Sequence, residues 1–274
     1  MRVDLHIHTI ASDGCWRPST VVDEVEKRGI GLLAVADHDT VANVGPTETL
    51  VRQAGLSFLR AVEISSFLDG DVFHVLAYGY DPDDAAFLAF LAENEARLMG
   101  TNVQIIHSLI AAGCALDVDD YLAYEFIRGR GGWKALNFLI DRGFCAGVGE
   151  YFERIAPNVS IDWSVFPHPA EVISHISEAG GTSILAHPGA NLHLAKGSSA
   201  LQPFLDFGVA GLECYSSYHD EAATNVCLDW CARHDLLVTG GSDCHGGFVG
   251  RELGRPAVNV ADLRLGDLAG RIVR

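Results

Sequence analysis

The sequence has few basic residues for its length. Its 274 residues include 19 lysines and arginines against 36 aspartates and glutamates, which gives a formal net charge of −17. A broad nucleic-acid-binding face needs many basic side chains to neutralise phosphates, so this composition argues against long duplex nucleic acid as a partner. It leaves room for a small, locally basic phosphate pocket, and it suits a protein that gathers divalent cations.

Two other features are missing. No apolar run reaches the roughly 18 residues that a membrane-spanning helix requires, and the first residues do not form an apolar leader. We therefore expect a cytoplasmic protein without a membrane partner. The seven cysteines are an odd number and include no Cys-x-x-Cys pair. This spacing argues against a structural zinc ribbon and against a disulfide framework.

What the sequence does contain is a series of short apolar runs, at residues 3–8, 32–37, 57–64, 72–80, 182–187, 209–215 and 236–243. Continuous apolar runs of this length predict parallel strands that are covered on both faces. Helical patterns, such as those at 18–29, 168–181 and 221–235, separate most of them. With 49% hydrophobic residues available for a core, the alternation predicts an α/β barrel of about seven strands.

The interval between Tyr80 and Thr182 is too long for a single connection. Residues 83–112 predict one or two helices, and residues 118–165 predict further helices and loops. We therefore divide the chain into a barrel domain at 1–80 and 182–274 and a mostly helical insertion at 81–181. The insertion follows the fourth predicted strand, and we expect it to cover the mouth of the barrel.

Histidines and carboxylates stand at the ends of the predicted strands, apart from His74, which lies inside the fourth. The candidates are His6, His8, Asp13, His38, Glu63, His74, His187, Asp243 and His245. The carboxyl ends of the strands form the active-site face of α/β barrels, so these residues are expected to meet at one mouth. His6 and His8 are two apart on a strand and point to the same face. Asp243 and His245 repeat this spacing, with Cys244 pointing away.

Six imidazoles and three carboxylates exceed what one ion with three or four protein ligands can use. They predict two to three divalent metal ions, with Glu63 bridging two of them. Mixed nitrogen and carboxylate ligation without thiolate favours manganese, iron or zinc over calcium or magnesium, and manganese is the first choice. We expect Asp37 and Asp39 to hold imidazoles by their far nitrogens.

The stretches DLHIHTIASDG, ADHDT, LAHPG and GGSDCHG together resemble the motifs of the PHP (polymerase and histidinol phosphatase) family, over about residues 1–80 and 182–245. The resemblance implies a distorted seven-stranded (β/α)7 barrel that holds a trinuclear metal centre. By motif, one ion would take His6, His8, Glu63 and Asp243. A second would take Glu63, His74 and His187, and a third would take Asp13, His38 and His245.

The insertion resembles that of a subgroup of this family that acts on small nucleotides. Its members remove the 3′-phosphate from nucleoside 3′,5′-bisphosphates, and some also trim short oligonucleotides. The subgroup often carries an Arg-Pro-His run, of which Arg130 matches the arginine, while Gly131 and Gly132 replace the other two residues. Arg128, Arg130 and Lys134 form a basic cluster that we expect to bind a phosphate that is not hydrolysed, with Arg130 as the first candidate.

The sequence therefore predicts a metal-dependent phosphomonoesterase. A side chain at the mouth would protonate the leaving alkoxide or orient the phosphate, and the candidates are His219, Asp13 and His245, with His219 also a candidate for substrate binding. Three alternatives remain open. They are a small phosphomonoesterase of the histidinol-phosphate type, an amidohydrolase that cleaves C–N bonds on the same kind of metal barrel, and a metal-stabilised binding module without activity.

Overall fold

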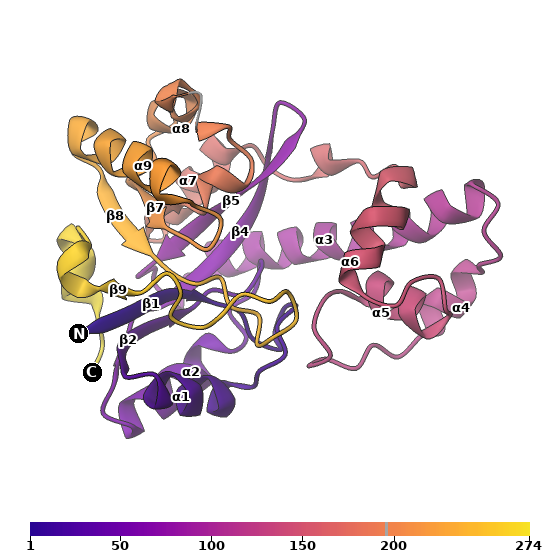
Figure 1. The fold of residues 1–274 in the computed structure, drawn as a ribbon, viewed down its shortest axis with the longest axis horizontal. Coiled ribbons are helices and arrows are strands. Elements are labelled where there is room, and N and C mark those ends of the chain that lie inside the picture. The colour runs from indigo at the N-terminus through magenta and orange to yellow at the C-terminus, as the bar shows by residue number, and fades with distance from the viewer. Residues whose placement is uncertain (195–196) are drawn as a thin grey trace.

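The computed structural model describes residues 1–194 and 197–274, and its strands alternate with helices (Figure 1). The strands are β1 (Arg2–Ile7), β2 (Ile30–Val35), β3 (Ser57–Phe58), β4 (Ala61–Leu68), β5 (Asp71–Tyr78), β6 (Thr182–Leu185), β7 (Gly211–Tyr215), β8 (Leu237–Gly240) and β9 (Val258–Asn259). The α-helices are α1 (Pro18–Lys27), α2 (Val44–Gln53), α3 (Ala85–Ala111), α4 (Val118–Ala123), α5 (Lys134–Asp141), α6 (Val148–Glu150), α7 (Pro169–Glu178), α8 (Gln202–Asp206) and α9 (Glu221–His234). This alternation confirms the α/β class.

The strands form two sheets. One has the order β3-β2-β1-β9, and the other has the order β4-β5-β6-β7-β8. Two isolated parallel bridges link the two edge strands of the five-stranded sheet to the other sheet. Ile7 of β1 pairs with Cys244, which follows β8, and His38, which follows β2, pairs with Glu63 of β4. With these bridges the strands follow one another in the ring order β2-β1-β8-β7-β6-β5-β4. The ladders among the described residues still form two separate sheets, so the closed seven-stranded barrel stays a prediction.

The single strand predicted at 57–64 is two strands, β3 and β4. β4 pairs antiparallel with β5, and β5 pairs antiparallel with β6. The expectation of parallel pairing is therefore wrong for this part of the sheet. Asp69 and Gly70, with φ of 51° and 100°, form the two-residue turn between β4 and β5. A turn this short can join only antiparallel strands, and an Asp-Gly pair is typical of it.

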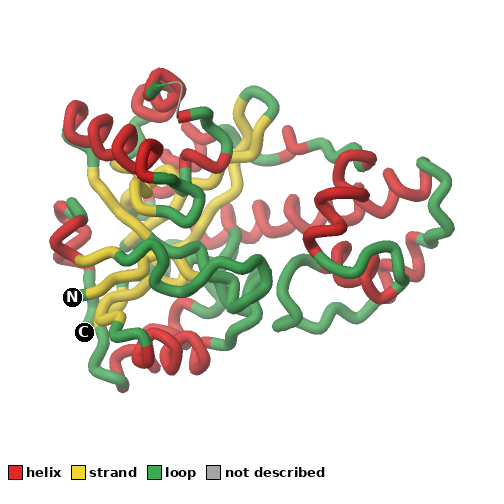
Figure 2. The backbone as a smooth tube through the Cα atoms, viewed as in Figure 1, coloured by secondary structure: helices red, strands yellow, loops and turns green. Residues whose placement is uncertain are grey.

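Helices cover the outer faces of both sheets (Figures 1 and 2). α1 and α2 pack on the four-stranded sheet, whereas α7, α8 and α9 pack on the five-stranded sheet. A further hydrophobic cluster joins the two sheets, with Leu5 and Leu32 from one and Leu76 and Ile184 from the other. Because both sheets are fixed to a common core, the ends of their strands hold defined positions relative to one another.

The helices from α3 to α6, between β5 and β6, form a helical projection on the right of Figure 1. α3 is one helix of 27 residues, about 40 Å long. Its outer half packs with α4 and α5 around a separate hydrophobic cluster that includes Ile106, Phe138 and Leu139. α7 also falls within 81–181, but it packs on β4, β5 and β6. The division into barrel domain and insertion stays a prediction.

None of the helices in the described part of the chain is long and apolar enough to cross a membrane. The cytoplasmic location stays a prediction.

Candidate metal centre

The structure brings all nine candidate residues together, most of them at or after the carboxyl ends of strands. Glu63 instead lies near the start of β4, and His74 lies in the middle of the antiparallel strand β5. Backbone hydrogen bonds hold these ends side by side. The His8 N–H donates to the Cys244 carbonyl at 2.9 Å, and the Asp39 N–H donates to the Glu63 carbonyl at 2.8 Å. Cys244 itself is buried against Ile7 in the cluster under α1, so it points away from its two polar neighbours as expected. Segments up to 240 residues apart in the sequence thus supply one site.

The first group consists of His6, His8, Glu63 and Asp243, whose candidate ligand atoms all lie within 4.8 Å of one another. The Nε2 atoms of His6 and His8 are 3.1 Å apart. His8 Nε2 also lies 2.9 Å from Asp243 Oδ1 and 3.2 Å from Glu63 Oε2. Two ring nitrogens and two carboxylate oxygens therefore converge, as the ligands of one ion do.

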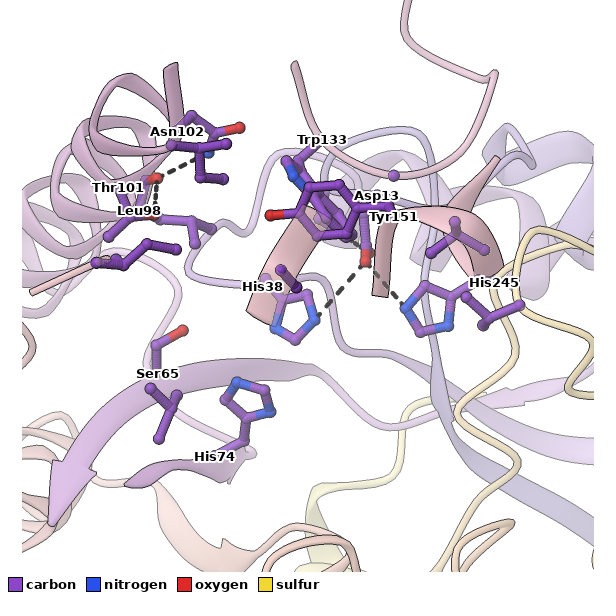
Figure 3. Close-up of a pocket in the computed structure, with 18 of the residues that line it drawn as sticks. Asp13, His38, Ser65, His74, Leu98, Thr101, Asn102, Trp133, Tyr151 and His245 are labelled. Carbon is purple, nitrogen blue, oxygen red and sulfur yellow. Dashed lines mark hydrogen bonds and ion pairs between the residues drawn. The ribbon is translucent and has the colours of Figure 1, made fainter. Parts of the chain in front are cut away.

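The second group consists of His8, Asp13, His38 and His245. Asp13 lies between two imidazoles (Figure 3), with Oδ2 3.1 Å from His245 Nε2 and 4.0 Å from His38 Nε2. This arrangement brings together the three residues that the motif comparison assigns to one ion.

Glu63 connects the first group to a third, which consists of His38, Glu63 and His74. Glu63 Oε1 lies 3.2 Å from His74 Nδ1 and 2.9 Å from His187 Nε2, while Oε2 lies 3.1 Å from His38 Nδ1. Its Oε1 thus faces His74 and His187, while its Oε2 faces His6, His8 and His38, so each oxygen meets a different set of imidazoles. Bridging of two ions by this carboxylate stays a prediction.

Two buried carboxylate oxygens, Glu63 Oε2 and Asp243 Oδ1, make no hydrogen bond within the described residues. Leaving a buried acceptor unpaired costs about 1–3 kcal/mol, and more for a charged group. Both oxygens belong to the first group and face the imidazole nitrogens there. Together with a donor set of imidazole and carboxylate, these unpaired oxygens fit divalent transition-metal ions. The three overlapping groups are consistent with a centre of more than one ion.

The carboxylates of the site are held in the ionised form that metal ligation requires. Burial raises the pKa of Glu63, but the surrounding imidazoles, His74 first, outweigh it and hold this pKa well below its usual value. Burial likewise raises the pKa of Asp243, and His6 and His8 hold it well below the usual range. Burial lowers the pKa of His8, but the Asp243 and Glu63 carboxylates beside its Nε2 raise it to about 10.

Asp37 and Asp39 hold the backbone and hydroxyl groups of the loops, so the expectation that they hold imidazoles is wrong. Asp37 accepts hydrogen bonds from the backbone and hydroxyl groups of Thr9 and Ser12, at 2.6–3.2 Å. Asp39 accepts from the backbone and hydroxyl of Ser65 and from the Asn94 amide, at 2.6–2.9 Å. Both carboxylates lie next to an imidazole in the sequence but fold away from the cluster.

Glu213 of β7 performs the role expected of those aspartates. It is fully buried, its Oε1 lies 3.0 Å from His6 Nδ1, and its Oε2 accepts the His187 backbone N–H at 2.9 Å. The first contact directs His6 Nε2 toward the cluster. Sequence reasoning missed Glu213, although a single acid inside the apolar run VAGLECY was an available signal.

Arg251 is a second residue that the sequence analysis missed. Its guanidinium donates to Asp243 Oδ2 and to the Tyr218 hydroxyl, and it lies 4.4 Å from the centre of the Tyr218 ring. Since Oδ2 of Asp243 is taken, Oδ1 is the oxygen that faces the cluster. The only sequence signal was a basic residue shortly after GGSDCHGG.

His219 lies near this end of the strands, but both of its ring nitrogens contact the backbone. Nδ1 is 2.8 Å from the Cys214 carbonyl, and Nε2 accepts the Gly189 N–H at 2.9 Å. Burial lowers the pKa of His219. This arrangement fixes the loop that follows His187, and it lends no support to His219 as a proton donor or a substrate contact.

A cavity of about 630 Å³ opens over the metal-ligand candidates and extends under the helical projection. Asp13, His38, His74 and His245 line its inner end, as Figure 3 shows. Its outer wall comes from α3, from the start of α5 and from the segment around α6. The cavity therefore joins the cluster to the helices that we expected to cover it.

The structure separates the three basic residues that the sequence placed in one cluster. Arg128 lines the cavity and donates to the Ala11 carbonyl, and Lys134 also lines it. Arg130 lies outside this lining, and its guanidinium is paired with the Asp141 carboxylate by two contacts of 2.7 Å. Sequence proximity could not reveal this pair because Asp141 comes from the far end of α5. Arg130 as the first candidate for phosphate binding is therefore not supported.

Comparison with known proteins finds relatives whose names agree with one another, since each is named for hydrolysis of a phosphate ester. The chain is 30% identical over 267 residues to a 3′,5′-nucleoside bisphosphate phosphatase from Chromobacterium violaceum, with 92% of this chain and 90% of the relative covered. It is 27% identical over 253 residues to a 5′-3′ exoribonuclease from Haemophilus influenzae, with coverage of 89% and 90%. No family model matches the chain.

Two solved structures share the fold over nearly their whole length. One, from Bifidobacterium adolescentis and named for metal-dependent phosphoesterase activity, has a TM-score of 0.79 at 27% identity and covers 99% of this chain and 96% of its own. The other, an amidohydrolase from Chromobacterium violaceum, has a TM-score of 0.83 at 26% identity, with coverage of 100% and 98%.

Identity of 30% over nine tenths of both chains, together with the histidine and carboxylate groups, shows the family. The chain belongs to the PHP family of metal-dependent phosphoesterases. It is therefore a metal-dependent hydrolase of phosphate esters, and the resemblance found in its motifs is confirmed.

Proposed function

We propose that this enzyme removes the 3′-phosphate from nucleoside 3′,5′-bisphosphates and gives the 5′-monophosphate and phosphate. The observation that carries this proposal is that one cavity, of about 630 Å³, contains both the metal-ligand candidates and a set of basic and aromatic side chains. Cavities of this size suit one small ligand. The name of the Chromobacterium violaceum relative supports the same substrate class.

As metal ligands we propose His6, His8, Asp13, His38, Glu63, His74, His187, Asp243 and His245, for two to three ions with manganese first and iron or zinc as alternatives. When bound, such ions supply an activated water and neutralise the phosphoryl oxygens. Glu213 holds His6 and Arg251 holds Asp243 by the atoms that face away from the cluster. For proton transfer to the leaving oxygen we keep Asp13 and His245 as candidates, because both line the cavity.

For the phosphate that is not hydrolysed we propose Arg128 and Lys134. Both line the cavity beside the candidate metal centre, and neither has a carboxylate within 3.5 Å among the described residues. Arg128 also sits against the loop that carries Asp13, through its bond to the Ala11 carbonyl. A guanidinium can hold two phosphate oxygens at once, so Arg128 is the stronger of the two candidates.

Short oligonucleotides are a second candidate substrate. The Haemophilus influenzae relative is named as a 5′-3′ exoribonuclease. Phe152, which lines the cavity, is 60% exposed and offers a face on which a further base can stack.

Turnover by manganese-loaded protein tests the proposal, measured as phosphate release for the phosphomonoesters and as product formation by chromatography for the trinucleotide and the amide. The panel contains a nucleoside 3′,5′-bisphosphate, a 5′-phosphorylated trinucleotide, histidinol phosphate and an amide. We expect the bisphosphate to be hydrolysed with the highest kcat/KM, and Asp243→Asn to abolish that turnover. Faster turnover of histidinol phosphate would contradict the substrate class. Turnover of the amide alone would support the amidohydrolase alternative, and no metal-dependent turnover at all would support the binding module.

A further inference from the structure

The outer part of the cavity is walled by aromatic side chains. They are Phe126, Trp133, Tyr151, Phe152, Trp163 and Phe166. Three of them form one contiguous group, with the Trp133 ring 5.1 Å from that of Tyr151 and 6.0 Å from that of Phe152. Aromatic residues make up only 9% of the chain, so this concentration in one wall is a local feature.

The two residues before Trp133 tie its segment to the loop that carries Asp13. Gly132 donates its backbone N–H to the Asp13 carbonyl at 2.7 Å, and Gly131 and Gly132 have φ of 82° and 73°. A Cβ atom on Gly131 would lie 2.6 Å from the Phe248 side chain, so only glycine allows this approach. Figure 3 labels Trp133, Tyr151 and Asp13 among the residues that line the cavity.

The Trp133 indole has a polar atom that the protein does not use. Its Nε1 is buried and makes no hydrogen bond within the residues that the structure describes. Buried donors are nearly always paired in native proteins, and an unpaired one needs an explanation. Trp133 lines the cavity, so a ligand that displaces its neighbours and reaches Nε1 with an acceptor atom would supply the missing partner.

We infer that Trp133 and its aromatic neighbours form the base subsite of this enzyme. The inference rests on the proposed function and deepens it. A heteroaromatic base has ring nitrogens or carbonyl oxygens that accept a hydrogen bond from the indole N–H. It also has faces that pack against the Tyr151 and Phe152 rings. An alkyl phosphate would leave the N–H unpaired, and a base-free sugar phosphate would leave the aromatic wall in contact with water.

The test compares a nucleotide with its base-free counterpart. The substrates are adenosine 3′,5′-bisphosphate and a ribose 3,5-bisphosphate analogue without base. Trp133→Phe removes the N–H and keeps an aromatic ring, so kcat/KM on the nucleotide should fall about 2- to 10-fold. Trp133→Ala removes the ring as well and should cost about 5- to 150-fold. On the base-free substrate both variants should stay within about twofold of wild type.

The matched control is Trp230→Phe. Trp230 is a buried tryptophan of α9 that lies outside the cavity lining, so this variant should retain wild-type kcat/KM on both substrates. Trp133→Phe keeps a ring against Tyr151 and Phe152, so this variant should unfold at nearly the wild-type temperature. Equal losses on the two substrates would overturn the inference, because Trp133 would then serve the fold of the wall.

Equilibrium binding separates this inference from the proposed function. Titration of the protein with adenosine 5′-monophosphate and with ribose 5-phosphate needs no turnover. We expect the nucleotide to bind more tightly to wild type and to lose this advantage in Trp133→Ala. If the two ligands bind equally while the bisphosphate is hydrolysed, the base subsite is wrong and the function stands. If the nucleotide binds through Trp133 but no ester is hydrolysed, the proposed reaction fails and the subsite stands.

Discussion

Arg251 and Glu213 each hold a proposed metal ligand by the atom that faces away from the cluster. Such contacts fix the orientation of the ligand and so the pre-organisation of the metal site. The Arg251 contact also leaves Asp243 Oδ1 turned toward the cluster. The chemistry of the centre therefore depends on residues that do not themselves face the cluster.

Substitution of Arg251 tests this dependence. Arg251→Gln frees the Asp243 carboxylate to turn, and manganese affinity should fall about 10- to 100-fold. Titration calorimetry on chelator-treated protein measures the change directly. Arg17→Gln, which alters an exposed arginine on another loop, should leave the affinity unchanged. Unchanged affinity in Arg251→Gln would show that the contact with Asp243 does not organise the site.

A second prediction at this scale separates Arg128 from Arg130. Arg128→Ala should lower kcat/KM on a nucleoside 3′,5′-bisphosphate about 10- to 150-fold, since a charge-assisted hydrogen bond contributes about 1.5–3 kcal/mol. It should change little on a nucleotide that has only the 3′-phosphate. Arg130→Ala breaks a pair with Asp141 in which both side chains are about one-third exposed, so its effect should stay within a few-fold. A larger loss of kcat/KM in Arg130→Ala than in Arg128→Ala would restore Arg130 as the residue that binds the second phosphate.

At the scale of elements, the helical projection is tied to the strand ends at two places. α3 reaches the site through Asn94, whose amide donates to Asp39 Oδ1 at 2.6 Å and to the Ser65 carbonyl at 2.9 Å. The segment before α5 reaches it through Gly132 and Asp13. These contacts hold the wall of the cavity against the loops that carry the proposed ligands.

The close approach of Gly131 to Phe248 can be tested with a matched pair of glycine substitutions. Gly131→Ala places a Cβ atom 2.6 Å from Phe248, whereas Gly143→Ala meets nothing within 4 Å, and both glycines have positive φ. Gly143→Ala should therefore cost only the backbone strain, about 1 kcal/mol. Gly131→Ala should cost about 1–3 kcal/mol more and also lower kcat/KM. Denaturant unfolding measures both, and equal losses of stability would show that the approach is not tight.

At the scale of the whole molecule, the acidic composition and the buried carboxylates lead to a prediction about metal. Elemental analysis of protein purified without chelator should find two to three equivalents per chain, and less than one after supplementation would contradict the proposal. At free manganese 100 times the Kd, binding stabilises the folded state by about 2.7 kcal/mol. This corresponds to a rise of about 5–10 °C in Tm for a chain of this size. Glu63→Gln, which alters the carboxylate predicted to bridge two ions, should lose most of this rise.

The local signals in the sequence determined the class of fold and the composition of the proposed centre. Apolar runs and helix patterns give the α/β alternation, and the histidines and acids at the run ends can be read directly, because a strand carries its side chains in a fixed order. The same signals misjudged the β4–β5 pairing, because the Asp69-Gly70 turn was not recognised. Had that turn been weighed, the hairpin would have been predictable as well.

Only the tertiary structure decided which partner each polar side chain takes. Asp37 and Asp39 sit beside histidines in the sequence but bind Thr9, Ser12, Ser65 and Asn94. His6 is held instead by Glu213, 207 residues away, and Arg130 is taken by Asp141. The physical reason is that a hydrogen bond or ion pair depends on distance in space within about 3 Å. That distance is set by how sheets and helices pack, which the order of residues alone does not specify.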